Sequence, residues 1–249
     1  MLVTQPVPED LEKYYDSDEY ISHSDTDKGL MPFLYQRVKS ITLSRKANLV
    51  NRLSNNRGTL ADIGAGTGDF LSVVKKDGWE VYGAEPNATA RKRAFNKGVD
   101  LVETIDEVSD KTYDIVTLWH VLEHLPELEF EINRLKRMVK PGGHLIIAVP
   151  NYKSYDAGYY QEYWAAYDAP RHLWHFSRKS MENIFCDSMH LVDVKPMWFD
   201  AFYVSLLSEK YKSGNSFSIK ALFIALWSNI KALNSKEYSS LIYCFQKPT

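Results

Sequence analysis

The sequence is short of several residue types and patterns that would point to particular classes of protein. Only two cysteines, Cys186 and Cys244, occur among 249 residues, and no CxxC pair is present. We therefore expect buried thiols rather than a disulfide framework or a cysteine-ligated zinc site. The sequence also lacks a run of about 18 apolar residues that could cross a bilayer, and it lacks a signal peptide. These absences predict a cytoplasmic protein without stable membrane insertion.

An excess of either charge is missing as well. The chain has 30 basic and 32 acidic residues, which leaves a net charge of −2. This balance gives no electrostatic footprint for nucleic acid, and no nucleic-acid partner is expected. Internal repeats and low-complexity tracts are also absent. With 45% hydrophobic residues, the length suits one large α/β domain with small additions.

The chain contains an alternation of apolar and amphipathic segments. Strands are predicted for "TLADI", "EVYGAE" and "GHLIIAVP", the last entered through a Pro-Gly-Gly turn, and "YDIVTLWHVL" is predicted to be a strand that runs into a loop. Helices are predicted between them, at residues 69–76, 88–96 and 127–139. This order predicts a parallel sheet with helices on both faces, in which ligands bind at the carboxyl ends of the strands. The side chains at these ends are Asp62, Glu85, Trp119 and Pro150.

A glycine-rich loop follows the first of these strands in "LADIGAGTGDFL", with glycines at positions 64, 66 and 68. Glycine permits positive φ and removes a side chain that would keep a ligand away from the backbone. The following helix presents free N–H groups. Such turns also serve tight packing, so the loop alone is ambiguous. Glu85, at the end of the next strand, could bind both hydroxyls of a ribose, could cap a helix, or could do both.

Two nucleoside ligands fit this pattern. A dinucleotide usually binds a GxGxxG loop through its pyrophosphate, whereas this loop reads GxGxG and has Asp62 just ahead of it. A carboxylate there would repel a phosphate but suits an ammonium group. S-adenosylmethionine carries an ammonium, a sulfonium and a ribose, without a phosphate. The residues therefore favour S-adenosylmethionine over NAD.

The chain resembles the class I S-adenosylmethionine-dependent methyltransferases through ordered motifs between Leu60 and Ser177. These are "LADIGAGTG", "VYGAEPN", "YDIVTLWHVLEHL", "LKRMVKPGGHLIIAVPN" and "DAPRHLWHFS". The last is similar to the subgroup related to ubiquinone-biosynthesis methyltransferases. The resemblance implies a doubly wound, mostly parallel seven-stranded sheet of the Rossmann-like methyltransferase fold. Its last strand, expected at Ser239 to Lys247, would be antiparallel.

The resemblance also implies which residues bind the cofactor. The methionine end would be held at the glycine loop, the ribose beside Glu85, and the sulfonium near an aromatic face, which suits a cation. A cap formed by the N-terminal stretch would cover the cofactor. Core packing, for the tryptophan, and surface exposure, for the N-terminal residues, are the alternatives. The residues in question are Asp62, Gly64, Ala65, Gly66, Glu85, Pro86, Trp119, His120, Tyr20 and His23.

Histidines are the candidates for catalysis. His172 or His175 could take a proton from an acceptor, because imidazole is poised near neutral pH, and His124 is a third candidate. A structural role competes for each. "HVLEH" also matches, at its last two positions, an ExxEH arrangement that binds a divalent metal in some related O-methyltransferases. The first position is His120 instead of glutamate. Since many metal-independent members of the family carry similar residues here, we expect no metal and a His124 that packs or hydrogen-bonds locally.

The remaining segments predict the domain organisation. Residues 1–56 would form an N-terminal cap and helix, and residues 57–249 the methyltransferase domain. Within that domain, an aromatic-rich lid at 151–176 could form a substrate pocket or simply pack. A helical insertion at 202–235 suits a core or dimer contact better than a membrane surface, which leaves a homodimer open.

The predicted function is S-adenosylmethionine-dependent methyl transfer to a small-molecule acceptor, with oxygen the favoured atom. Because methyl transfer from a sulfonium is an in-line displacement, it needs alignment and, for some acceptors, a base. Two alternatives remain open. The chain could be a catalytically silent module that binds a nucleoside and a partner, or an NAD-dependent oxidoreductase, which the loop spacing disfavours.

Overall fold

The computed structural model describes residues 1–5, 30–54, 57–215 and 218–249, with side chains from residue 36 onward in the first long helix. These residues form two compact units. The glycine-loop unit comprises residues 30–54, 57–119, 129–146 and 246–249. The helical unit comprises residues 1–5, 120–128, 147–215 and 218–245.

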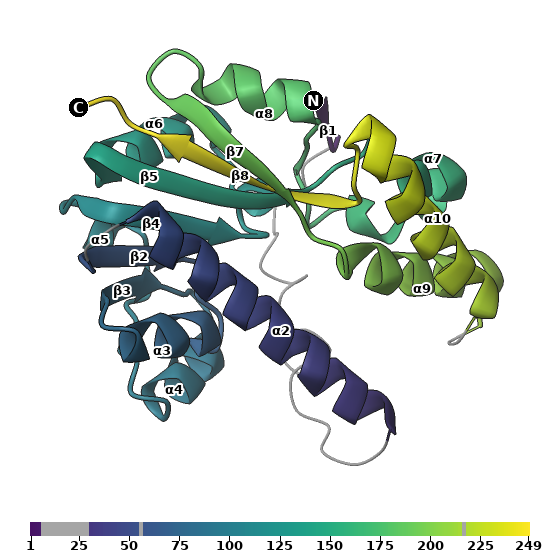
Figure 1. Ribbon diagram of the computed structural model, residues 1–249, viewed down its shortest axis with the longest axis horizontal. Helices are drawn as coiled ribbons and strands as arrows, with labels where there is room; N and C mark the ends of the chain where they lie inside the picture. The colour runs from purple at the N-terminus through teal and green to yellow at the C-terminus, as the bar shows by residue number, and fades with distance from the viewer. Residues whose placement is uncertain (6–29, 55–56, 216–217) are drawn as a thin grey trace. The chain divides into compact units, whose positions relative to one another are not determined.

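The glycine-loop unit is built around three parallel strands in the order β3 (Glu80–Ala84), β2 (Thr59–Ile63) and β4 (Tyr113–Trp119). Leu60 lies opposite Val81 of β3 and Ile115 of β4. Figure 1 shows β2 between β3 and β4. Strands β2 and β4 are rich in buried apolar side chains, as expected for a parallel sheet covered by helices, whereas β3 is buried only at Gly83 and Ala84.

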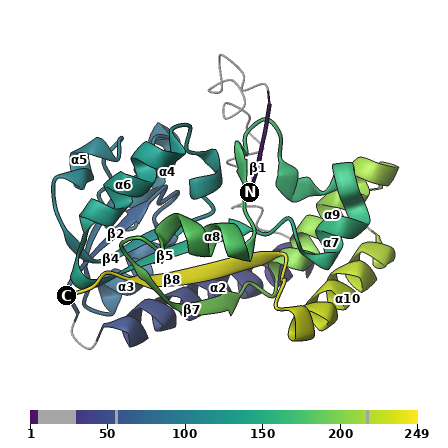
Figure 2. The same ribbon diagram turned by 90° about the horizontal axis from the view of Figure 1, so that it is seen from above.

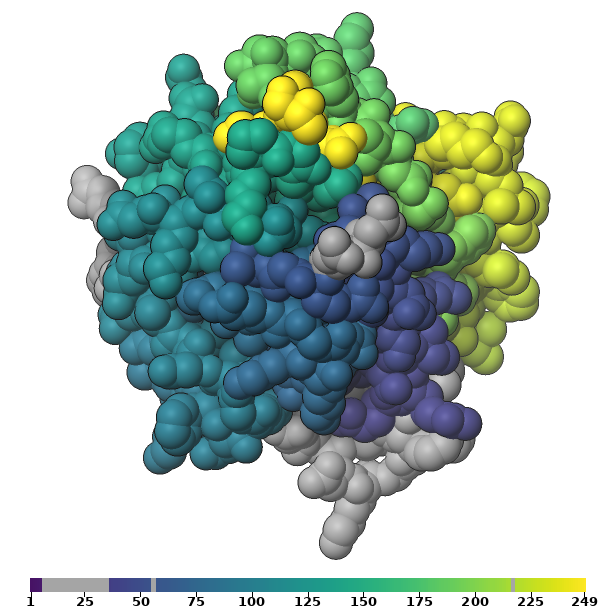
Figure 3. Space-filling model, turned by 60° about the vertical axis from the view of Figure 1, so that its left-hand side comes forward, coloured from purple at the N-terminus to yellow at the C-terminus, as the bar shows by residue number. Residues whose placement is uncertain are grey.

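Helices connect and cover these strands. They are α2 (Leu30–Leu53), α3 (Asp69–Lys76), α4 (Ala88–Phe95), α5 (Asp106–Ser109) and α6 (Leu128–Met138). In α3 the residues Phe70, Leu71 and Val74 are buried, a spacing that places them on one helical face. The helix α2 packs against α3. In Figure 3 the purple and blue atoms of α2 lie beside the lighter blue atoms of the residues that follow it in the chain.

The central sheet has the strand order β3-β2-β4-β5-β8-β7, with β5 at Val139–Pro150, β7 at His190–Pro196 and β8 at Ser240–Gln246. Strand β8 runs antiparallel to β5. Near one end the N–H of Gly142 donates to the carbonyl of Lys247 (2.9 Å) and the N–H of Lys247 donates to the carbonyl of Gly143 (3.0 Å). Past the other end, the N–H of Asn151 donates to the carbonyl of Ser239 (2.8 Å). The predicted doubly wound sheet with an antiparallel last strand is thus confirmed.

The strand count differs from the seven expected, since six strands belong to this sheet in the part of the chain that the structure describes. At the position of the seventh, Val102 forms one isolated parallel bridge to Ala84. The reason is local, because the backbone N–H groups of Glu103 and Thr104 donate to the side chain of Glu107 (3.2 and 3.0 Å). These bonds turn the chain into α5 instead of extending the strand.

The start of β5 also differs from the prediction. The strand begins at Val139 and includes Pro141, Gly142 and Gly143, which were expected to form a turn before it. Gly142 adopts φ +76, and this conformation, open to glycine, lets the strand kink while its N–H still pairs with Lys247.

The helical unit contains α7 (Tyr155–Tyr160), α8 (Arg178–Phe185), α9 (Asp200–Ser213) and α10 (Ile219–Ser235). Short strands β1 (Leu2–Val3) and β6 (Trp174–His175) pair antiparallel. The helices α7, α9 and α10 pack together, as Figure 2 shows. Among the residues described, no helix combines the length and apolar character needed to cross a bilayer.

Candidate functional site

The glycine loop is fixed to the end of the neighbouring strand by backbone hydrogen bonds. The N–H groups of Gly64 and Ala65 both donate to the carbonyl of Ala84 (2.8 and 3.0 Å). Gly64, Gly66 and Gly68 adopt φ values of 68°, 54° and 71°. A side chain at such φ is strained, which explains why glycine recurs at every second position.

The glycines at 66 and 68 have different surroundings. A Cβ added to Gly68 would lie 2.7 Å from the Cβ of Ala94 in α4, so this glycine allows close helix packing. Apart from its two chain neighbours, a Cβ added to Gly66 would meet no atom of the described residues within 4 Å. Gly66 therefore leaves open space beside the backbone, as a ligand that lies along the loop requires.

Glu85 is buried and accepts hydrogen bonds from the glycine loop and from the residue that caps α4. Its Oε2 accepts a hydrogen bond from the N–H of Gly66 (2.8 Å), and its Oε1 accepts one from the N–H of Asn87 (2.9 Å). The cap of α4 is Asn87, whose Oδ1 accepts from the N–H of Ala90 (2.9 Å). Each carboxylate oxygen of Glu85 keeps a further lone pair that could accept from a hydroxyl. Pro86 is exposed, and its carbonyl accepts from Arg91 (2.7 Å).

Asp62 is a buried acid at the carboxyl end of β2. Its Oδ1 accepts a hydrogen bond from the hydroxyl of Thr117 (2.6 Å). Burial raises the pKa of Asp62 to about 7, against the lowering effects of this bond and of the Lys46 ammonium. A cation that enters beside Asp62 would favour the carboxylate form, because opposite charge lowers a carboxyl pKa.

Trp119 ends β4 and offers two features to a ligand. Its ring already attracts a cation, since the Lys46 ammonium lies 4.2 Å from the ring centre. The edge of Phe70 contacts the same ring, with centroids 5.3 Å apart. The indole Nε1 is buried and has no hydrogen-bond partner among the described residues. A ligand carboxylate would satisfy this donor.

His120 directly follows Trp119 in the chain and has φ +59. In the helical unit its ring lies between Glu123 Oε1 (3.2 Å) and Asp200 Oδ2 (3.1 Å). Burial lowers its pKa, but hydrogen bonds and charge from Asp200 and Glu123 outweigh this effect and raise it to about 10. His120 is therefore an imidazolium held by two carboxylates. Sequence reasoning did not find Asp200, which lies 80 positions away.

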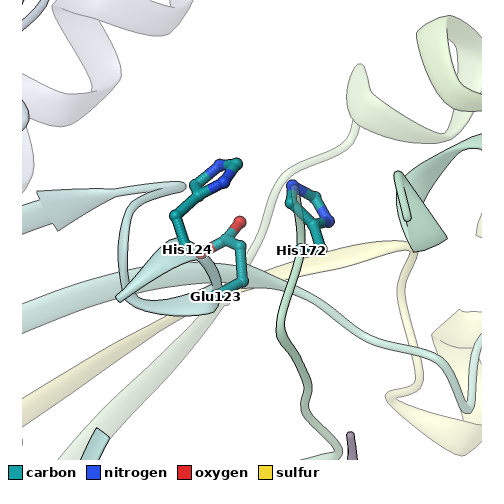
Figure 4. A group of neighbouring side chains, drawn as sticks. All are labelled: Glu123, His124 and His172. Atoms are coloured by element: carbon teal, nitrogen blue, oxygen red, sulfur yellow. The ribbon is translucent and has the colours of Figure 1, made fainter. Parts of the chain in front are cut away.

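Glu123, His124 and His172 form a cluster in the helical unit, shown in Figure 4. The two imidazole rings meet edge to face, with centroids 4.5 Å apart. His124 Nδ1 lies 3.1 Å from the carbonyl of Arg171, and His172 Nδ1 lies 2.8 Å from that of Ala166. Because a carbonyl oxygen only accepts, each Nδ1 carries a proton and donates it, so Nε2 is the atom of each ring through which a proton or an ion could be bound.

One carboxylate oxygen and two imidazole nitrogens of this cluster lie within 4.8 Å of one another. Glu123 is 1% exposed, and its Oε2 has no hydrogen-bond partner in the part of the chain described. Such a set can accept a proton from a bound molecule or hold a divalent cation. The sequence-based metal motif included His120, whereas the structure brings His172 to this position.

The three histidines predicted to be catalytic differ in their surroundings. Burial lowers the pKa of both His124 and His175 to about 4, so both are neutral and weakly basic near pH 7. His175 Nε2 also lies 3.0 Å from the hydroxyl of Thr4. His172 is fixed by the hydrogen bond of its Nδ1, and its Nε2 lies 3.8 Å from Asp168 Oδ2, so a carboxylate stands beside the nitrogen that could accept a proton.

Much of the aromatic lid packs in the interior of the helical unit. Tyr160 and Trp164 belong to a buried cluster with Val204 of α9. The Trp164 Nε1 donates to Asp156 (2.8 Å), a fully buried carboxylate that also accepts from two serine hydroxyls. Sequence reasoning missed Asp156, because a single acid among tyrosines gives no signal of burial.

Two predicted cofactor residues, Tyr20 and His23, lie outside the described residues.

The sequence of this chain is similar to those of known methyltransferases. A family described as a methyltransferase domain matches residues 38–188. The ubiquinone biosynthesis O-methyltransferase of Cronobacter sakazakii is 34% identical over 137 residues, which are 51% of this chain and 55% of that protein. The protein of the same name from Vibrio cholerae is 35% identical over 131 residues, 48% of this chain and 53% of that protein. The chain thus spans about half the length of these curated relatives.

Solved structures show the same fold at low identity. A methyltransferase from Archaeoglobus fulgidus, described as S-adenosylmethionine-dependent, has a TM-score of 0.57 and 21% identity, covering 88% of this chain and 100% of its own. Phosphoethanolamine N-methyltransferase 2 of Haemonchus contortus, in complex with S-adenosylmethionine, has a TM-score of 0.56 and 15% identity, covering 83% and 53%.

Proposed function

This chain belongs to the family of S-adenosylmethionine-dependent methyltransferases, and from that premise we propose that it methylates an oxygen atom of a small organic acceptor. The observation that carries the choice of oxygen is the buried His172, whose Nδ1 is held by the Ala166 carbonyl so that Nε2 is the nitrogen that would take a proton, because a hydroxyl must lose a proton when it is methylated. The O-methyltransferase names of the relatives support the same choice.

The residues of the glycine-loop unit fit the cofactor group by group. Asp62 would pair with the ammonium, and Trp119 Nε1 would donate to the carboxylate. Gly66 leaves the space along the backbone, and Glu85 would accept from the ribose hydroxyls. The fit rests on the buried acid Asp62, the unpaired buried donor Trp119 Nε1 and the open space beside Gly66. The described residues of the protein alone do not explain these three features, and a bound ligand would.

When bound, the cofactor supplies a methyl group on a cationic sulfur. The protein then needs no nucleophile of its own, and its residues bind, align and exclude water. In this proposal His172 holds the acceptor hydroxyl through Nε2 and takes its proton. The hydrogen bond from His172 Nδ1 to the Ala166 carbonyl keeps the ring in the tautomer that this step requires.

The cluster also fits a divalent cation, although the sequence analysis expects none. The unsatisfied Glu123 Oε2 favours this second mechanism, in which Glu123, His124 and His172 would hold an ion that lowers the pKa of the acceptor hydroxyl. Titration with Mn²⁺, followed calorimetrically, tests it. If the parent protein binds Mn²⁺ and Glu123→Gln does not, His172 would act as a metal ligand instead of as the base. If the parent protein does not bind Mn²⁺, the base mechanism stands.

A binding experiment tests the function as a whole. Purified protein is titrated calorimetrically with S-adenosylhomocysteine and, as control, with NAD. Micromolar binding of the first alone is expected, followed by transfer of a labelled methyl group to members of a panel of phenols and other hydroxyl compounds. Preferential binding of NAD would favour an oxidoreductase. Binding of S-adenosylhomocysteine without transfer to any acceptor would favour a silent module that binds a partner.

A further inference from the structure

The helix α10 buries its small and polar side chains and exposes most of its large apolar ones, the reverse of an ordinary amphipathic helix. The side chains that it buries are small or polar: Ala221, Ala225, Ser228, Asn229 and Ala232. Six of its eight large apolar side chains point outward and are 44% to 67% exposed, while Leu222 and Ile224 are partly buried. The six are Ile219, Phe223, Leu226, Trp227, Ile230 and Leu233. A helix of a globular protein normally buries its large apolar stripe. These six exposed residues are termed the α10 face.

The α10 face is continuous. At 3.6 residues per turn its members fall within an arc of about 120° along the whole helix. Beside it lies a cavity of about 200 Å³ lined by the apolar side chains of Leu226, Ile230 and Leu233 together with Trp198 and two phenylalanines that precede or begin α9. Single exposed apolar residues are ordinary, but a contiguous stripe marks an interaction surface.

The charge around this face is mostly positive, although Glu237 lines a hollow with Trp227 and Lys231. Residues 210–236 contain no aspartate or glutamate, although the whole chain has a net charge of −2. This stretch contains five exposed lysines: Lys210, Lys212, Lys220, Lys231 and Lys236. Lys220 pairs with Glu209 (3.2 Å), which lies just before the stretch. The Lys231 ammonium lies 5.4 Å from the ring of Trp227, so charge and aromatic surface are adjacent.

We infer that the α10 face docks on a membrane surface that contains anionic lipids. An exposed tryptophan and phenylalanine, aliphatic side chains and flanking lysines are the composition of helices that lie in the plane of the lipid interface. Because the small-residue side of α10 packs on α7 and α9, only the outer face would enter the headgroup region. This inference is independent of the proposed function.

The lysines argue against a second copy of the chain as the occupant. In a twofold contact the same patch lies on both sides, so two sets of lysines would be brought together. Like charges across an interface are unfavourable, whereas anionic headgroups are complementary to them.

Vesicle sedimentation tests the inference on the full chain. Vesicles of phosphatidylcholine alone are compared with vesicles of equal parts phosphatidylcholine and phosphatidylglycerol. We expect binding to the anionic vesicles only, and a partition coefficient lowered about tenfold or more in the double variant Phe223→Ser, Trp227→Ser. Lys231→Glu with Lys236→Glu should also weaken binding, through charge alone.

A matched control comes from the other unit. Phe95 of α4 is 68% exposed and Phe223 is 67% exposed, so Phe95→Ser removes an equally exposed ring. It should leave vesicle binding unchanged, and circular dichroism should show that all variants fold. The inference fails if the parent protein binds neither vesicle, if both vesicles bind equally, or if the double variant binds like the parent. It also fails if the double variant converts a dimer to a monomer in analytical ultracentrifugation without any vesicle binding by the parent.

Discussion

The two units of this molecule build their candidate sites in different ways. In the glycine-loop unit the backbone does much of the positioning, through the N–H groups of Gly64, Ala65 and Gly66. These groups donate to two consecutive residues, the carbonyl of Ala84 and the carboxylate of Glu85. In the helical unit the positioned groups are side chains of distant segments, as His120 with Asp200 and His124 with His172 show.

This difference predicts that binding and chemistry can be separated by mutation. Changes in the glycine-loop unit should alter cofactor affinity, while changes in the histidine cluster should alter turnover. A variant that moves both quantities together would break the comparison.

The largest effect is expected for His172→Gln, which keeps a polar side chain but cannot take up a proton. Turnover should fall by about 10²- to 10⁴-fold, the usual contribution of a general base. Affinity for S-adenosylhomocysteine, measured by calorimetry, should stay unchanged. His175→Gln is the matched control and should cost less, because the pKa of His175 is lowered to about 4. Full activity of His172→Gln would remove the base from the proposal.

Asp62→Asn should cost the most affinity. It removes the buried carboxylate that we propose pairs with the cofactor ammonium, at about 2–5 kcal/mol for a buried charge pair. Thr117→Val is the control, since it removes only the hydrogen bond to Asp62 and should have a smaller effect. Calorimetric titration of both variants measures the difference. Equal affinities of Asp62→Asn and the parent would exclude Asp62 from the site.

The same contrast explains what the sequence could and could not predict. The range of α3 and the extent of β2 agree with the predictions, because apolar spacing and glycine position are local signals. The prediction of seven strands was wrong for the part of the chain described, which has six in this sheet. Hydrophobic periodicity gives no sign that two backbone N–H groups donate to the side chain of Glu107. Asp200 beside His120 and His172 beside His124 were unpredictable as pairs, because tertiary packing alone brings them together.

A smaller loss of affinity is expected for Glu85→Gln. The amide replaces one of the two carboxylate oxygens that accept from Gly66 and Asn87, and it would bind the ribose less well. We expect a loss of about 1–3 kcal/mol in the free energy of S-adenosylhomocysteine binding. Asn87→Ala is the control, because loss of the α4 cap should lower the free energy of unfolding by about 1 kcal/mol but leave affinity intact. A variant that binds as tightly as the parent would refute the ribose assignment.

The smallest effect is a dependence of affinity on pH. Because burial raises the pKa of Asp62 to about 7, this group is mostly protonated at pH 6 and mostly ionised at pH 8. Only the carboxylate attracts an ammonium, so affinity for S-adenosylhomocysteine should weaken about tenfold as the pH falls from 8 to 6. Asp62→Asn should abolish the dependence. Lys46→Met should shift its midpoint to higher pH, because the Lys46 charge lowers the pKa of Asp62. A dependence that survives in Asp62→Asn would assign the proton to another group.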